Sequence, residues 1–375
     1  MTALLVLLSI ILIAIVAVQI GKVTDLASKI RGEEDMQESI NKRQGAYLLL
    51  FLILFIVLSI GTGVMYKNYM FNFGMEAASE HGPILDRLFN VTLFFTGIVF
   101  VVTQVLLFYF AFKYRGRKGQ KASFISHDNR LEIVWTLIPA VVMTFLVIGG
   151  LDAWNEVMGD VKDGEEYIEI EATGYQFGWS IRYPGADGLL GEKNFRLIDG
   201  TNPLGQNWED EKNLDDFQAS EIYLPVNKKI RVRITSKDVL HNFYLPHFRV
   251  KMDAVPGMPT YFVFTPTKTT EEFRQQLKKF PEYQIPDDET DPTGPKLWET
   301  FDYELACAEL CGSSHYAMRL PVKVVSEAAF AEWVGQQASF YESTIKGTDN
   351  DPLRVEGALS EAAPETEEAL DAEHE

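Results

Sequence analysis

Soft metal-ligating side chains gather in one short segment of the chain. Residues 307–318 read Cys-Ala-Glu-Leu-Cys-Gly-Ser-Ser-His-Tyr-Ala-Met, so Cys307, Cys311, His315 and Met318 stand at spacings of four, four and three. Another histidine, His241, lies upstream after Asp-Val-Leu. Two thiolates, two imidazoles and a thioether suit copper, and blue-copper sites use one thiolate, two imidazoles and a weak axial Met. The second thiolate allows two sulfurs to bridge two copper ions, an arrangement suited to electron transfer.

Three simpler interpretations compete with copper. Cys307 and Cys311 could form a disulfide, which is the default for two cysteines on an oxidising face. A tetrahedral zinc site could use the same two cysteines with two histidines, but it needs no Met. Met318 alone could be a core residue. The combined pattern nevertheless favours a copper centre.

The elements that must position these residues are short β-strands. Strict alternation of apolar and polar residues at 167–171 and 230–235 predicts half-buried strands, and His241 follows the second of them. Shorter β-rich runs lie at 221–224, 260–264, 303–306 and 320–325. Several short strands separated by Pro and Gly predict a β-sandwich or barrel.

A helix and three polar stretches complete this half of the chain. Ser326 is suited to cap a helix from Glu327 to about Tyr341, which would pack on the barrel or on a neighbouring subunit. Residues 184–220 and 268–299 are rich in Asp, Pro or Gly and resemble insertions between strands. Beyond Arg354 the tail holds eight acidic residues and no Lys or Arg, which predicts disorder.

The N-terminal half predicts a membrane anchor of four helices. Four uncharged apolar runs, at 2–21, 44–66, 88–112 and 133–151, each supply about 20 residues, enough for the hydrocarbon core of a bilayer. The loops after the first and third runs carry most of the Lys and Arg, which places them in the cytoplasm. The N-terminus and the β-rich half are then expected outside.

Charge separates the two halves as clearly as hydropathy does. Residues 1–153 hold 13 Lys and Arg and 11 Asp and Glu, whereas residues 154–375 hold 21 and 42. The acidic half disfavours nucleic acid and favours basic partners. We expect two N-terminal helices at 1–66, a helical hairpin at 67–153, a β domain at 154–346 and a tail at 347–375.

The ligand segment resembles the dinuclear copper (CuA) signature of subunit II of the haem-copper cytochrome c oxidases. The resemblance covers roughly residues 80–340 and implies a membrane-anchored α plus all-β fold, with a cupredoxin-like domain. It also implies that His241, Cys307, Cys311, His315 and Met318 bind copper through side chains. Glu309 would bind copper through its carbonyl and direct its carboxylate to a magnesium or manganese ion shared with subunit I.

Two further blocks carry the resemblance. Residues 127–139, His-Asp-Asn-Arg-Leu-Glu-Ile-Val-Trp-Thr-Leu-Ile-Pro, are similar to the start of the family's second helix, where Glu132 would lie at the mouth of a proton pathway. In the aromatic segment 174–183, Phe177 stands where the family has the Trp that receives the electron, and Trp179 follows. The resemblance implies electron uptake at these two positions.

Other departures concern partners and cofactors. The extra helices are expected to bind another subunit or a partner respiratory complex, and His247 is expected to be a surface or second-shell residue. The chain contains no Cys-x-x-Cys-His sequence, so no covalent haem is expected.

The resemblance implies a subunit of a bacterial plasma-membrane oxidase, with the copper domain on the periplasmic face. It would take electrons from a cytochrome c and pass them to haem in subunit I, where oxygen reduction drives proton pumping. Its partners would be subunit I, other oxidase subunits and membrane lipid. A metal-free structural anchor of a quinol oxidase and a copper-delivery or zinc-binding membrane protein are the alternatives.

Overall fold

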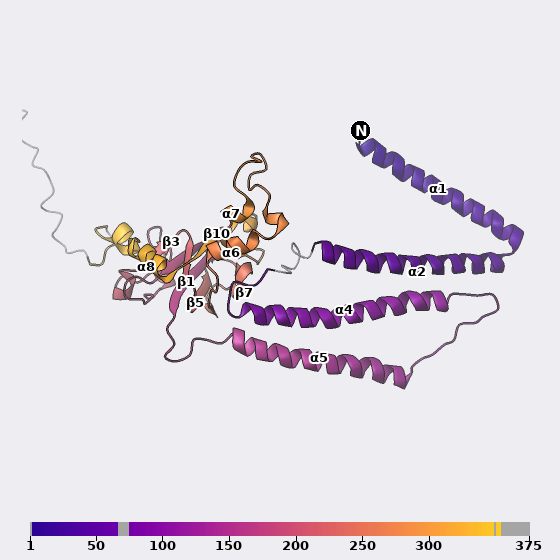
Figure 1. Cartoon of the computed structure of the whole chain (residues 1–375), viewed down its shortest axis with the longest axis horizontal. Coiled ribbons are helices and arrows are strands. Elements are labelled where there is room, and N and C mark those ends of the chain that lie inside the picture. Colours follow the sequence, from indigo (N-terminus) through magenta and orange to yellow (C-terminus); the bar gives the residue numbers. More distant parts are fainter. Residues whose placement is uncertain (1, 67–74, 349, 354–375) are drawn as a thin grey trace, which may run out of the picture. The chain divides into compact units, whose positions relative to one another are not determined.

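The computed structural model describes residues 2–66, 75–348 and 350–353 (Figure 1). At positions 2–8, 10, 28 and 31 it describes the backbone alone. The chain divides into a helical unit and a β unit. Residues 75–86 belong to the β unit although they precede the second half of the helical unit. The tail predicted to be disordered lies almost entirely outside the described residues.

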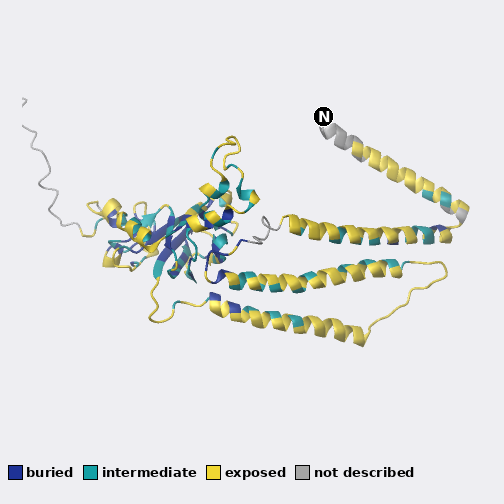
Figure 2. Ribbon diagram, in the orientation of Figure 1, coloured by how far each residue is buried: buried dark blue, intermediate teal, exposed yellow. Residues whose placement is uncertain are grey.

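Four long helices make up most of the described part of the helical unit. They are α1 (Thr2–Arg31), α2 (Glu33–Met65), α4 (Gly82–Lys113) and α5 (Asn129–Val157). Among the described residues, α2, α4 and α5 are long and apolar enough to cross a membrane, and their apolar side chains are largely exposed (Figure 2). These helices contain the predicted spans 88–112 and 133–151 and all but the last residue of the span 44–66. The run at 2–21 forms a helix as expected, and its role as a membrane span stays a prediction.

Aromatic contacts hold neighbouring helices of this unit together. Phe51 of α2 packs on Phe108 of α4, with ring centroids 5.6 Å apart, and Phe95 of α4 meets Phe145 of α5 at 6.1 Å. At the other end of α2, Lys118 forms a 2.8 Å ion pair with Asp35. The second N-terminal helix is thus packed on the hairpin along much of its length.

Two five-stranded sheets form the described β unit, in agreement with the predicted β-sandwich or barrel. The strands are β1 (Ile168–Tyr175), β2 (Gly178–Tyr183), β3 (Phe217–Ala219), β4 (Ile222–Pro225), β5 (Ile230–Ser236), β6 (His241–Leu245), β7 (Val250–Ala254), β8 (Thr260–Phe264), β9 (Tyr303–Cys307) and β10 (Arg319–Val325). The strand order is β3-β2-β1-β5-β8 in the first sheet and β4-β10-β9-β6-β7 in the second.

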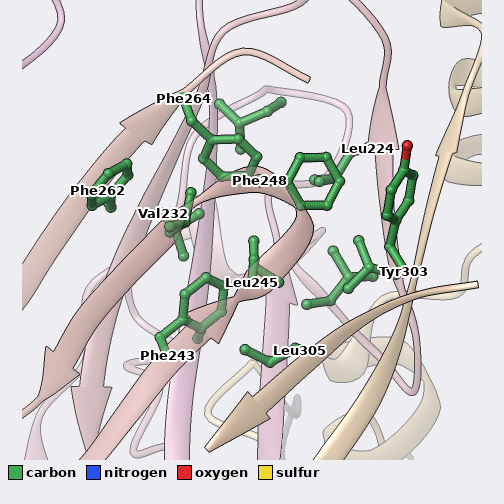
Figure 3. Close-up of a cluster of buried hydrophobic side chains, with 14 of the residues drawn as sticks. Leu224, Val232, Phe243, Leu245, Phe248, Phe262, Phe264, Tyr303 and Leu305 are labelled. Atoms are coloured by element: carbon green, nitrogen blue, oxygen red, sulfur yellow. The ribbon is translucent and has the colours of Figure 1, made fainter. Parts of the chain in front are cut away.

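Inward-facing side chains of both sheets form one apolar core. In β5, Ile230, Val232 and Ile234 are buried and alternate with partly exposed neighbours. Figure 3 shows Val232 of the first sheet with Phe243 and other side chains of the second sheet in this core. In β5 the period of two in the sequence therefore matches the core-facing positions.

The predicted C-terminal helix is shorter than expected. Helix α8 (Glu327–Gly335) begins at the Ser326 cap, whose hydroxyl accepts a hydrogen bond from the Ala329 N–H, and it ends at Gly335 rather than near Tyr341. Glycine lowers the stability of a helix because it loses more backbone entropy on folding than any other residue, and helices therefore often end near a glycine. Trp333 of this helix stacks on Tyr223 with ring centroids 4.5 Å apart, so the helix packs on the β unit.

Both polar stretches contribute more structure than the sequence indicated. Residues 184–220 end in edge strand β3. Residues 268–299 contain helix α6 (Thr270–Leu277), which buries Phe273 and Leu277, and most of the short helix α7 (Leu297–Thr300). Part of each stretch is therefore integrated into the folded domain.

Buried charges join the first of these stretches to the outer face of the first sheet. The Arg182 side chain of β2 is almost fully buried and donates to Glu171 of β1 through Nε at 3.0 Å and to Asp216 through Nη1 at 2.7 Å. Arg182 also donates to the Asn213 side chain and the Gly191 carbonyl. This group of side chains fixes residues 191–216 against the sheet.

Candidate metal centre

One hairpin connection and one neighbouring strand supply the candidate ligands. Cys307 is the last residue of β9, and Met318 directly precedes β10, with the Cys307 N–H donating to the Met318 carbonyl at 3.2 Å. His241 begins β6, whose Phe243 pairs with Cys307 in the sheet. The loop and the distant histidine are thereby brought to the same end of the second sheet.

The structure brings all six predicted ligands together. His241 Nδ1 lies 3.8 Å from Cys307 Sγ, which lies 3.2 Å from the Glu309 carbonyl oxygen and 4.0 Å from Cys311 Sγ. Cys311 Sγ in turn lies 3.6 Å from His315 Nδ1 and 3.3 Å from Met318 Sδ. The two sulfurs therefore occupy the middle of the group, with a histidine on either side.

This geometry distinguishes among the three candidates for the site: a disulfide, a zinc site and a copper site. Cys307 and Cys311 are free, and their sulfur separation of 4.0 Å is about twice the length of a disulfide bond. The thioether of Met318 joins the group, which a four-ligand zinc site does not require. Two thiolates, two imidazoles, a thioether and a carbonyl form a soft donor set that fits copper.

Four of the six candidate ligand residues are buried, whereas His315 is half-buried and Glu309 is exposed. The His241 and Met318 side chains are almost fully buried, and both cysteines are buried. Burial, together with the neighbouring Cys307 thiol, raises the pKa of the Cys311 thiol to about 11. Because metals bind the thiolate form, loading of this site must release protons.

Two residues beside the ligands were missed by the sequence reasoning. Asp238 accepts a hydrogen bond from His241 Nε2 at 2.8 Å and from the Gln176 backbone N–H at 2.7 Å. The Gln176 side chain donates to the Cys311 carbonyl at 2.5 Å. Asp238 therefore turns His241 Nδ1 toward the sulfurs, while Gln176 holds the ligand loop. The three-residue spacing between Asp238 and His241 was the available signal in the sequence.

Close packing of β1 on the ligand histidine requires a glycine. A Cβ atom at Gly174 would lie only 2.9 Å from the His241 ring. A larger residue there would displace either β1 or the imidazole. The glycine that opens the aromatic segment thus sets the position of a candidate ligand.

The two aromatic candidates for electron uptake differ in exposure. Trp179 is buried and lies edge-on to the His241 ring, with centroids 6.1 Å apart. Phe177 is 36% exposed, and its ring lies beside Gly312 in the ligand loop. Leu310 and Tyr316, which the sequence reasoning did not select, are each about 80% exposed on that loop. The loop thus combines buried donors with an exposed apolar surface.

Three further side chains singled out in the sequence do not join the donor cluster. The Glu309 side chain is exposed beside its candidate carbonyl ligand. Glu132 is exposed in the first turn of α5. His247 lies beyond the far end of β6 and packs among aromatic rings, including Phe301 with centroids 5.1 Å apart, so its assignment as a surface or second-shell residue was wrong. Burial lowers the pKa of His247 to about 4.

The fold and site define a class: a membrane-anchored protein whose β-sandwich domain carries a buried cluster of soft metal donors. Sequence comparisons specify it further. Residues 168–276 match the family described as cytochrome c oxidase subunit II, periplasmic domain, and residues 67–152 match the corresponding transmembrane domain. The chain belongs to the cytochrome c oxidase subunit II family and is a membrane-anchored subunit of a haem-copper oxidase.

Individual relatives agree with this assignment. The alternative cytochrome c oxidase subunit 2 of Bradyrhizobium diazoefficiens is 32% identical over 290 residues, covering 77% of this chain and 92% of that protein. Cytochrome c oxidase subunit 2 of Thermostichus vulcanus is 27% identical, with coverages of 72% and 80%. The crystal structure of the periplasmic domain of subunit II from Bradyrhizobium japonicum is 29% identical, with coverages of 46% and 95% and a TM-score of 0.28. The assignment therefore rests on the sequence matches.

Proposed function

We propose that this chain is the electron-accepting subunit of its oxidase. It takes electrons from a cytochrome c and delivers them to haem in subunit I, where oxygen is reduced to water and protons are pumped. The observation that carries the proposal is the clustering of six donor atoms, from His241 and from the segment Cys307 to Met318, with the two cysteine sulfurs at the middle. His241 lies within the matched periplasmic domain, whereas the ligand loop lies beyond it.

The donor set fits a dinuclear copper centre, with His241, Cys307, Glu309, Cys311, His315 and Met318 as its ligands. When bound, the two coppers supply a one-electron carrier whose charge is shared between both metals. The protein holds the donors in a loop whose backbone is fixed by Gln176 and by the β9 and β10 pairing. A buried and rigid site limits the rearrangement of solvent and ligands that accompanies each electron.

Two carboxylates have proposed roles outside the copper ligands. The exposed Glu309 side chain would bind a magnesium or manganese ion shared with subunit I. Glu132 would take up protons at the cytoplasmic end of α5, in the region matched to the transmembrane domain. An ionisable residue at the end of a membrane helix is suitably placed for exchange with water.

The proposed setting is a bacterial plasma membrane, with the β unit on the periplasmic face and the N-terminus outside. The domain boundaries at 66, 153 and 346 belong to the same proposal. The acidic charge of residues 154–375 would steer a basic or dipolar donor, and that steering should weaken as salt increases. Phe177 and Trp179 are the proposed positions of electron uptake, and α1 and α2 would contact another subunit or a larger respiratory assembly.

Electron paramagnetic resonance on the full chain, purified in detergent and loaded with copper, tests the metal assignment. We expect two coppers per chain and a mixed-valence signal shared by both. Cys311→Ser should abolish this signal, whereas Ser313→Ala, an exposed change in the same loop, should retain it. Zinc binding, a single isolated copper, or an unchanged signal in Cys311→Ser would contradict the proposal.

A further inference from the structure

A cavity of about 530 Å³ lies on the outer face of the first sheet. Strands β1 and β5 form its floor, and residues 193–204 and 256–259 contribute to its walls. Residues 193–204 belong to the stretch that the buried Arg182 fixes to the sheet. Part of the cavity wall therefore comes from a polar stretch that has no role in the proposed electron transfer.

Three cationic side chains line the cavity, although this half of the chain is strongly acidic. Arg233 and Lys237 project from the same face of β5 and its continuation because they stand four positions apart, and Lys193 comes from the wall. Among the described lining residues, Glu171 is the one acid. Its carboxylate is already bound by Arg182 and Lys193.

The lining cations are only partly neutralised by the protein. Arg233 forms a 3.0 Å ion pair with Glu169, which also binds Arg231. Lys237 lies over the Tyr175 ring at 6.0 Å. Burial, and then repulsion from Arg233 and Lys237, lowers the pKa of Lys193 to about 8. A bound anion would relieve this repulsion and complete the charge balance.

Apolar side chains and hydroxyl groups form the rest of the lining. Phe195 is 76% exposed, and Ile198 is also exposed, so both present apolar surface. Thr173 and Thr235 supply hydroxyl groups beside the cations, whereas the Ser236 hydroxyl already donates to the Val239 carbonyl. The remaining apolar lining is provided by Pro203, Leu204, Pro256 and Pro259. A concave site with apolar walls and a few convergent polar groups is typical of a small-molecule site.

We propose that this cavity binds a small organic anion, a carboxylate or phosphate that carries an apolar substituent. The cations and hydroxyl groups bind the anionic group, and Phe195 with its apolar neighbours covers the substituent. The proposal goes beyond electron transfer and does not depend on the metal assignment.

Calorimetric titration of the full chain in detergent tests the site with phenyl phosphate, benzoate, inorganic phosphate and the neutral benzyl alcohol. We expect one site per chain for phenyl phosphate or benzoate. The better aromatic anion should bind about tenfold more tightly than inorganic phosphate because its ring buries apolar surface. Benzyl alcohol should show no saturable binding. The preference between the first two probes identifies the anionic group.

Lys237→Gln should weaken binding of the preferred probe about tenfold, because it removes one charge-assisted contact. Lys237 is exposed, so this change should preserve the fold. Lys212→Gln makes the same charge change at another exposed lysine and serves as the control. Arg233→Gln provides a second weakening variant. Equal affinity for aromatic and inorganic anions, no binding, or equal weakening by the control would overturn the proposal.

Discussion

Substitution of Asp238 by Asn should weaken copper binding while preserving the fold. The Asp238 carboxylate accepts hydrogen bonds from His241 Nε2 at 2.8 Å and from the Val239 and Gln176 backbone N–H groups, each at 2.7 Å. All three partners act as donors when His241 directs Nδ1 toward the sulfurs. Asparagine offers one acceptor oxygen, so its amide nitrogen would face another donor.

The expected loss follows from the lost acceptor. A hydrogen bond to a charged group contributes about 1.5–3 kcal/mol. Residues that orient a ligand histidine typically change metal affinity by about 10–100-fold, which is the same range. Asp238→Asn should therefore increase the dissociation constant for copper by about 10–100-fold, with a smaller change in thermal unfolding of the metal-free chain.

Competition with a copper chelator measures this effect on the purified full chain, and electron paramagnetic resonance reports the geometry of the bound metal. Asp199→Asn is the matched control because Asp199 also accepts from backbone N–H groups, those of Thr201 and Asn202, outside the candidate site. The orientation argument would be refuted by wild-type affinity and an unchanged spectrum in Asp238→Asn, or by an equal loss in the control.

Three further predictions concern other charged groups. Arg182→Met should lower the free energy of unfolding by about 3–5 kcal/mol, because it leaves Asp216 buried without its cation and leaves Glu171 with Lys193 alone. Exposed Arg196→Met should change it by less than about 0.5 kcal/mol in denaturant titrations. His247 stays neutral in the folded protein down to a pKa of about 4, so acidification from pH 7 to 5 should cost about 2 kcal/mol of stability, a dependence that His247→Phe should remove. Glu132→Gln in the assembled oxidase should slow oxygen consumption without changing copper content; unaltered turnover would argue against proton uptake there.

The sequence predicted the core and the ligand loop because both depend on local patterns. Alternation in β5 identifies Val232 and Ile234 as core residues, and it requires no knowledge of the partner strands. The loop between β9 and β10 carries five of the six candidate donors within twelve residues. Spacing alone could therefore indicate its chemistry.

Interactions between distant segments were not predictable in the same way. Gln176 reaches the Cys311 carbonyl across 135 positions, and no periodicity records that contact. Polar composition suggested that residues 184–220 formed an ordinary insertion, whereas their Asp216 neutralises a buried arginine of the sheet. His247 was misplaced because its aromatic surroundings come from residues 273, 301 and 303, far along the chain.

The buried Arg182 group also limits how this domain can be shortened or recombined. Removing residues 184–216 to obtain a minimal copper domain would expose Glu171 and Arg182 to water and delete Asp216. Transferring the same residues to a related sandwich that lacks the sheet charges would bury Asp216 without a cation. Residues 184–216 therefore depend on Glu171 and Arg182 of the sheet, and these two residues depend on them. Chimaeric subunits should exchange all of them together.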